Sequence, residues 1–568
     1  MERVVESVVG AALRRMKAAG KVPESFAGAV AVERPRREEF GDFGCAIPLA
    51  LAKATRRPPA ECGRDLIAAM ELPDGVFDFV NFAPPGYVNF KVRPAAWFGQ
   101  LRAISEAPLQ YGDNDVGQGE KVLLEFVSAN PTGPLHVGHA RGAVLGDALG
   151  RVMRASGYAV ATEYYINDVG NQMAMLGRSI WARGREALGL PVEFPEKGYH
   201  GDYVRELAAI LAATPEGRAA CEAAYEDLGP ADDNAATAFA ATRLLARIRE
   251  DLGVLGVAFD QWFSERSLHE GGLLRAAVDD LLAKDAAYRD EAGAVLFRME
   301  GDADDRVVVR ANGMPTYFAS DIAYHDEKAR RGFARLINIW GADHHGYIPR
   351  MRAALSACGR DPDMLEVLLV QMVTLTRGGQ VVVLSKRSGE FVTLREVVDE
   401  VGPDAVRFIF LMRRADAQME FDLELAKQQT MENPVYYVQY GHARVASIVR
   451  KAATLGYEVP AYDDGLGAAL ELPEEAAIVR QLCMFPGVVA SAARRREPHH
   501  VAFYLNDLVG AFHGYYTKYK HSERVVSADA RKTASRLFLS SCVKAVLARG
   551  LGLLGVRAPE EMHYGEDV

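Results

Sequence analysis

The sequence is poor in the features that mark membrane, secreted and disordered proteins. Its 568 residues include only six cysteines and no CxxC pair, which argues against a zinc ribbon or a disulfide scaffold and favours a reducing cytoplasm. No uninterrupted apolar run reaches the roughly 18–20 residues that span a bilayer. Residues 1–17 alternate charged and apolar side chains, as in an amphipathic helix rather than a signal peptide. Hydrophobic residues make up 49 % of the chain, which excludes disorder of the whole chain.

The sequence also lacks an overall basic excess, since its net charge is −10. This charge is unevenly spread: residues 1–112 carry +2, residues 431–568 carry +1 and the part between them carries −13. An acidic centre between nearly neutral ends fits a small cationic substrate in the middle and polyanion contacts at the ends. Ordinary surface solvation explains the same pattern, so charge alone leaves both readings open.

The order of predicted elements indicates a multidomain α/β protein. Residues 1–112 combine amphipathic helices with a closing alternating strand at 86–92, which predicts a small α+β domain. Residues 426–568 are almost wholly helical and predict an all-α bundle. We expect the domain between them, 113–425, to carry a helical insertion at about 185–290.

The middle domain opens with the order strand, loop, helix, strand. An apolar run at 121–127 precedes the breaker-rich stretch 130–134, a helical pattern at 138–156 and a second strand pattern at 159–166. This βαβ order is typical of a Rossmann-like, doubly wound parallel sheet. We therefore expect a ligand-binding loop between the first strand and its helix.

That loop carries two histidines at a spacing suited to phosphate chemistry. His136 and His139 lie where backbone N–H groups at a helix N-terminus face an incoming anion. Two imidazoles three residues apart can stabilise the negative charge that develops as a phosphoryl bond breaks. Gly138 lacks a Cβ, so a flat base can lie against its backbone.

The segment Glu125–His139 (EFVSANPTGPLHVGH), here called the signature segment, resembles the first signature of class I aminoacyl-tRNA synthetases, specifically the arginyl-tRNA synthetase family. Residues 383–387 (VLSKR) resemble the second signature, the KMSKS loop, with Val383 in place of its first lysine. Lys121 or Arg387 is a candidate for the missing positive charge. The resemblance implies catalytic roles for His136, His139, Lys386 and Lys121. It implies ATP contacts for Thr132, Gly133, His136, Gly138, His139, Asp343, His344, Leu384, Ser385 and Lys386.

The segment 313–324 (GMPTYFASDIAY) resembles the arginine-binding helix of the same family. Recognition of a guanidinium requires acceptors that match its planar fork. Asp321 can accept from one edge of the fork, and Tyr317 lies one helical turn earlier on the same face. The resemblance implies arginine contacts for Glu125, Ser128, Asn130, His136, Tyr317 and Asp321. The adjacent His344 and His345 would point apart, so we expect no shared metal ion.

Both ends of the chain resemble tRNA-contacting domains of this family. Aromatic and basic residues suit stacking on splayed bases and contact with phosphates. The implied tRNA contacts are Phe43, Tyr437, Arg444, His513, Tyr516 and Lys518. Residues 198–202 also resemble a family segment, but their pattern indicates no role.

The resemblance implies an arginine–tRNA ligase that uses ATP with Mg²⁺, has no structural metal, and acts as a cytoplasmic monomer without membrane attachment. Its substrates would be L-arginine, ATP and tRNA(Arg). Three alternatives stay open: a nucleotidylyltransferase, which also uses HxGH; a catalytically silent tRNA-binding paralogue; and a class I synthetase for another amino acid. The length and helical end argue against the first alternative, and the set of retained site residues argues against the second.

Overall fold

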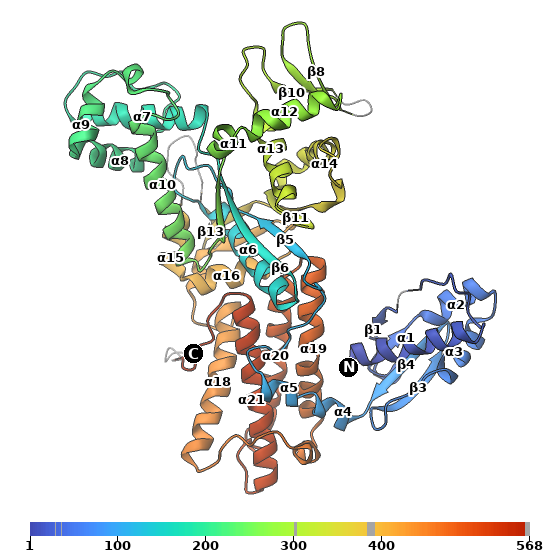
Figure 1. The fold of residues 1–568 in the computed structure, drawn as a ribbon. Helices are drawn as coiled ribbons and strands as arrows, with labels where there is room; N and C mark the ends of the chain where they lie inside the picture. The colour runs from blue at the N-terminus through green and yellow to red at the C-terminus, as the bar shows by residue number, and fades with distance from the viewer. Residues whose placement is uncertain (29, 36, 300–303, 383–391, 563–568) are drawn as a thin grey trace.

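The computed structural model describes residues 1–28, 30–35, 37–299, 304–382 and 392–562 (Figure 1). Its N-terminal part is an antiparallel sheet in the order β1-β2-β4-β3 with helices packed on it, which confirms the small α+β unit. The elements are α1 (Glu2–Ala18), β1 (Val32–Glu33), β2 (Phe43–Cys45), α2 (Ile47–Thr55), α3 (Pro59–Ala68), β3 (Phe77–Ala83) and β4 (Tyr87–Val92).

The central sheet is fully parallel, in the order β12-β11-β5-β6-β7. Its strands are β5 (Lys121–Glu125), β6 (Ala159–Ile166), β7 (Gln261–Ser264), β11 (Arg335–Gly341) and β12 (Leu365–Val370). Val122 and Leu124 face one hydrophobic core and Leu123 faces another, as expected for a strand covered on both faces. The strand order runs in opposite directions on either side of β5 and β11, and this confirms the doubly wound architecture.

Helices cover both faces of this sheet (Figure 1). On one face lies α6 (Val137–Ala155), the helix that follows the signature segment. The other face is covered by α12 (Leu273–Ala283), α13 (Tyr317–Arg330) and α14 (Ile348–Ala357). A three-stranded sheet, β8 (Ala287–Arg289), β9 (Val295–Phe297) and β10 (Arg306–Val309), packs beside α12 and α13.

The helical segment α7–α10 interrupts the sheet between β6 and β7. It consists of α7 (Asn171–Ala187), α8 (Asp202–Ala213), α9 (Pro215–Glu222) and α10 (Ala235–Val254), which share a core of their own. The predicted insertion at about 185–290 is corrected here, because β7 lies inside that range and pairs with β6 in the central sheet. With four residues, β7 is too short to show a strand pattern.

The C-terminal part is a bundle of four long helices: α18 (Pro434–Thr454), α19 (Pro473–Arg495), α20 (His499–Tyr519) and α21 (Ala530–Leu553). Between it and β12 lie β13 (Val373–Arg377), β14 (Gln380–Val381), α15 (Leu394–Val401), α16 (Pro403–Leu411), β15 (Met419–Asp422) and α17 (Leu423–Lys427). Among the described residues α19 alone is long and apolar enough to cross a membrane. It packs against α20, α6 and α4 (Pro94–Gly99), and core helices of soluble proteins pass the same test.

Candidate active site

The signature segment begins at the carboxyl end of β5, next to the point where the strand order reverses. The neighbouring strand β11 ends at Gly341 on the same edge. In doubly wound sheets, ligands bind outside the carboxyl ends of the strands at this reversal. The topology therefore places the loop after β5 and the loop after β11 on the two sides of one candidate site.

His136 and His139 lie together at the N-terminus of α6. The Gly138 N–H donates to His136 Nδ1 at 3.1 Å, and the His136 N–H donates to His139 Nδ1 at 3.2 Å. The two rings stack with centroids 3.8 Å apart. These two bonds fix both imidazole rings against the backbone of the first turn of α6. The pair and the positive end of the helix can therefore act on one anion.

Gly138 and Gly146 allow two close approaches of α6. A Cβ at Gly138 would lie 2.9 Å from His136 Cε1, so the glycine makes room for the imidazole. A Cβ at Gly146 would lie 2.2 Å from the Phe126 ring, at the start of the signature segment. These contacts fix the helix against the loop that carries the histidines.

The backbone directly after β5 is strained. Val127 and Ser128 both have positive φ angles, 68° and 41°, which non-glycine residues rarely adopt. The Ser128 hydroxyl donates to Glu125 Oε1 at 2.9 Å and accepts from the Tyr165 N–H at 3.1 Å. These bonds hold the turn and leave Ser128 at the carboxyl edge of the sheet, as predicted.

Of the lysines predicted to contact the phosphates, the structure describes Lys121 but not Lys386. Lys121 is the first residue of β5 and lies at the opposite edge of the sheet, about 13 Å of strand from Glu125. It cannot serve the phosphates beside His136, so this prediction is wrong. Leu384, Ser385 and Lys386 lie outside the described residues. The chain resumes just after them, and Thr393 forms a β-bridge with His136.

The predicted arginine acceptor Asp321 lies on α13 among other polar groups. Tyr347 donates a short hydrogen bond to Asp321 Oδ2. Burial, with the nearby Glu265 and Glu125 carboxylates, raises the pKa of Asp321 to about 7. Burial also raises the pKa of Glu265, whose carboxyl group lies near the Ser320 and Tyr165 hydroxyls. A site with several buried carboxyl groups favours a cation.

The carboxylate of Glu125, which is predicted to contact arginine, already has two protein partners. Its Oε2 forms an ion pair with the fully buried Lys328, and its Oε1 accepts from Ser128. Lys328 also donates to Asn338 Oδ1 at 3.2 Å. These partners fix the orientation of the Glu125 carboxylate, and its contact with arginine stays a prediction.

The other predicted contacts surround this centre. Tyr317 opens α13 with 54 % of its surface exposed, and Asn130 donates to Gln172 Oε1 on α7 at 2.8 Å. Thr132 and Gly133 are half-buried within the signature segment. Asp343 and His344 are exposed in the loop after β11.

Sequence reasoning missed Glu265, Lys328 and Tyr347. Lys328 lies seven residues after Asp321, which places it on the same face of α13. Glu265 directly follows β7, so recognition of that short strand would have placed it at the carboxyl edge of the sheet. Tyr347 closes the segment 340–347, which the sequence singled out without assigning this residue.

The predicted tRNA contacts of the bundle gather on α18 and α20. The Arg444 guanidinium lies over Tyr440 and Tyr516 at 4.8 and 5.4 Å from the ring centroids. Tyr437 packs edge-on against His513 at 5.4 Å. Burial and the nearby Arg444 lower the pKa of His513 to about 4, so this ring is neutral at physiological pH. Lys518 is more peripheral and pairs with Glu474.

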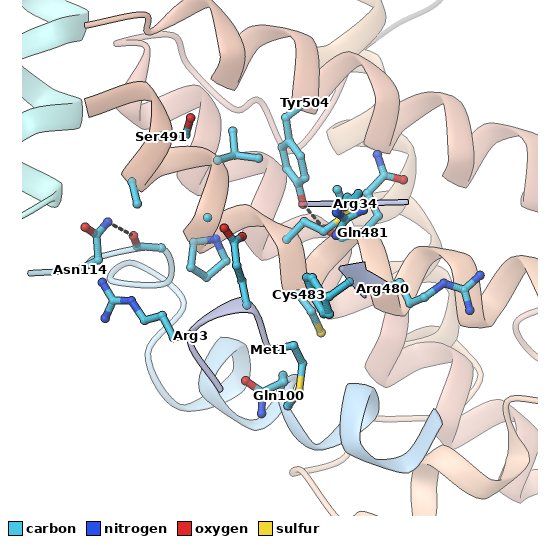
Figure 2. A pocket seen from close by; sticks show the side chains of 18 of the residues that line it. Met1, Arg3, Arg34, Gln100, Asn114, Arg480, Gln481, Cys483, Ser491 and Tyr504 are labelled. Atoms are coloured by element: carbon cyan, nitrogen blue, oxygen red, sulfur yellow. Dashed lines mark hydrogen bonds between the residues drawn. The ribbon is translucent and has the colours of Figure 1, made fainter. Parts of the chain in front are cut away.

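A cavity of about 1270 Å³ lies between the N-terminal unit and helices α19 and α20 (Figure 2). Arg3, Arg34, Arg480 and Asn114 line it, while the signature histidines do not. Phe43 borders this cavity but is only 3 % exposed, with its ring 5.7 Å from Trp97. Its predicted role as a tRNA contact therefore conflicts with its burial, which makes Phe43 part of the core.

Family models match all three parts of the chain. The model of the class I tRNA synthetase (R) catalytic domain matches residues 103–445, more than half of the chain. The model of the arginyl tRNA synthetase N-terminal domain matches residues 3–92, and that of the DALR anticodon binding domain matches residues 438–562. The chain belongs to the arginyl-tRNA synthetase family.

Individual members of this family resemble the chain over nearly its full length. The arginine–tRNA ligase of Syntrophotalea carbinolica is 47 % identical over 96 % of both chains. That of Desulfosudis oleivorans is 46 % identical over 99 % of this chain and all of its own. The solved arginyl-tRNA synthetase of Thermus thermophilus superposes with a TM-score of 0.77 at 26 % identity, covering 99 % of this chain and 100 % of the other.

Proposed function

We propose that the residues at the carboxyl edge of the central sheet carry out the arginine–tRNA ligase reaction of this family. Membership of the family identifies the chain as an ATP-using ligase that joins arginine to tRNA. The observation that supports the assignment of residues is the juxtaposition of the histidine pair with the carboxyl cluster around Asp321. The first can act on a nucleotide phosphate, and the second can bind a guanidinium.

In the first step, the arginine carboxylate attacks the α-phosphorus of ATP, and pyrophosphate leaves. His136, His139 and the N-terminus of α6 stabilise the negative charge that develops on the phosphate oxygens. Thr132, Gly133, Gly138, Asp343 and His344 are the proposed ATP contacts on the two flanking loops. Lys386, with Leu384 and Ser385, completes the proposed set of ATP contacts, and Mg²⁺ accompanies ATP as part of the substrate.

Asp321 supplies the specificity for arginine. Its carboxylate accepts from the guanidinium fork, Glu265 adds a second buried acceptor nearby, and Tyr317 closes the exposed side. Ser128 and Asn130 contact the amino and carboxylate groups at the other end of the substrate. Glu125 and Lys328 hold this arrangement from below through their ion pair.

In the second step, the 2′-hydroxyl of the 3′-terminal adenosine of tRNA(Arg) attacks the adenylate and releases AMP. Arg444, Tyr437, His513, Tyr516 and Lys518 on the bundle contact the tRNA. We also propose that the protein works as a monomer in the cytoplasm, free of membranes and of structural metal. One group within the described residues, Glu497, His499 and His500, has ligand atoms within 4.8 Å of one another, so bound metal should be measured directly.

A charging assay with total tRNA and each of the twenty amino acids tests the activity, and only arginine should be accepted. His139→Asn tests the histidine pair: it should lower arginine-dependent ATP–pyrophosphate exchange by roughly 10²-fold or more, as expected for the loss of one oxyanion donor. His345→Asn, in the exposed loop after β11, is a matched control that should stay near wild type. Unchanged exchange in His139→Asn would refute the proposed mechanism.

A further inference from the structure

The helical segment α7–α10 touches the signature segment at the turn 130–133, here called the ATP turn. The Tyr203 hydroxyl, in the first turn of α8, donates to the Thr132 carbonyl at 2.7 Å. The Tyr199 phenol lies near the Thr132 side chain and near Tyr317. Asn130 donates to Gln172 on α7. Tyr203 and Gln172 of the helical segment therefore bond to two residues of the ATP turn, and Tyr199 lies beside them.

Tyr203 controls the direction of a backbone donor. The Thr132 carbonyl and the Gly133 N–H belong to one planar trans peptide and point in opposite directions. Anchoring the carbonyl to Tyr203 therefore aims the Gly133 N–H away from α8. No partner for this N–H lies within the described part of the chain, so it is available to a phosphate oxygen. A Cβ at Gly133 would lie only 3.3 Å from the Tyr203 hydroxyl, which leaves little room for another arrangement.

Tyr203 and Tyr199 are themselves held by the helical segment. Both rings pack against its core, and the Tyr199 N–H donates to the buried Ser179 hydroxyl on α7 at 3.0 Å. Residues 198–202, whose sequence indicated no role, thus carry Tyr199 at the end of the α7–α8 connection and lead directly to Tyr203 in α8. The two tyrosines are therefore held in place by the helical segment α7–α10 and not by the ATP turn that they support.

We propose that Tyr203 is a positioning residue that orients the ATP turn for nucleotide binding, with Tyr199 extending the brace toward the arginine helix α13. This inference rests on the proposed function, because it needs the turn to contact ATP. Loss of this brace should weaken ATP binding more than arginine binding, because the Tyr203 hydroxyl fixes the peptide between Thr132 and Gly133. The carboxyl cluster around Asp321 keeps its own contacts with Tyr347, Ser320 and Tyr165.

Tyr203→Phe tests the brace because it removes the hydroxyl and keeps the ring. The KM for ATP in pyrophosphate exchange should rise roughly three- to tenfold, as for the loss of one hydrogen bond, while the KM for arginine stays within about twofold. Tyr225→Phe is the matched control: it removes a buried tyrosine hydroxyl of the same segment, which bonds to the Ala174 and Ala231 carbonyls instead. It should leave both KM values unchanged.

Thermal unfolding of both variants separates positioning from folding. If Tyr203→Phe is too unstable to assay, Gly133→Ala is the second test. Its methyl group would crowd the Tyr203 hydroxyl and disturb the same contact, so it should also raise the KM for ATP selectively. Equal changes in both KM values, no change, or the same change in Tyr225→Phe would overturn the brace. All exchange assays contain tRNA, because the family resemblance implies that activation needs it. A wild-type protein without arginine-dependent exchange in the presence of tRNA would instead overturn the proposed function.

Discussion

The charge of Asp321 depends on whether a cation lies beside it. Burial raises the pKa of this carboxyl to about 7, with Glu265 and Glu125 adding to the effect. An adjacent guanidinium favours the ionised carboxylate and lowers this pKa again. Arginine binding is therefore coupled to release of a proton from Asp321 whenever this carboxyl group is protonated before arginine binds.

This coupling predicts a pH dependence of arginine use. As the pH falls below about 7, kcat/KM for arginine should decrease by up to tenfold per pH unit, because only the ionised carboxylate binds the guanidinium. Steady-state kinetics across this pH range will measure the dependence of kcat/KM on pH.

Asp321→Asn should lose most arginine affinity together with this pH dependence. Asp326→Asn, on the same helix but paired with Arg330 and Arg360, should retain the wild-type profile. A flat wild-type profile would contradict the role of Asp321.

Residues within a continuous pattern could be predicted from the sequence, and residues that meet only in space could not. His136, His139, Tyr317 and Asp321 were found because each belongs to a local pattern that fixes its neighbours. Glu265 reaches the same site from a separate strand, so nothing near it in sequence marks it. The error at Lys121 has the opposite cause: it is close to the signature segment in sequence but lies at the other edge of the sheet.

The same rule applies to whole elements. The strand predicted at 159–166 is confirmed over its full length as β6, and the helix predicted at 138–156 begins and ends one residue earlier as α6. Both have a strong local period and clear breakers at their ends. Within the predicted helical insertion, the residues from 202 to 254 are instead divided into α8, α9 and α10. Its alanine-rich composition favours helix throughout, and the breaks depend on packing around Pro215 and the turn after residue 228.

Helix α6 provides a prediction at the scale of an element. Gly146→Ala places a methyl group 2.2 Å from the Phe126 ring, so the helix or the signature segment must shift. We expect a loss of about 1–3 kcal/mol in stability and reduced pyrophosphate exchange, because His136 and His139 are carried by the same helix. Gly142→Ala is the control within α6, since a Cβ there meets no atom within 4 Å.

Gly142→Ala should be neutral or stabilise the protein by about 0.5–1 kcal/mol, because alanine loses less conformational entropy in a helix than glycine does. Thermal or urea-induced unfolding of the two variants, together with exchange kinetics, will compare them. Equal effects of the two substitutions would show that close packing on Phe126 does not fix the helix.

In the whole molecule, one buried guanidinium joins parts that are distant in sequence. Arg407 on α16 is 1 % exposed and forms an ion pair with Asp147 on the signature helix α6. It also donates to the Leu554 carbonyl beyond α21 at 2.9 Å and to the Leu255 carbonyl after α10 at 3.0 Å. The helix that carries the histidines, the helical segment and the bundle therefore meet at one side chain.

Arg407→Met should destabilise the protein by about 3–5 kcal/mol, because it leaves the buried Asp147 carboxylate with only the more exposed Arg151 as a charged partner. Thermal unfolding will measure the loss, and a higher KM for tRNA should accompany it as the bundle loosens from α6.

Adding Asp147→Leu to Arg407→Met removes the buried carboxylate and should restore much of the stability, since an apolar pair can replace a buried ion pair. Arg557→Ala, at the exposed pair with Asp404, should cost at most about 1 kcal/mol. If the double variant were no more stable than Arg407→Met alone, the lost bonds to Leu554 and Leu255, rather than the buried carboxylate, would account for the destabilisation.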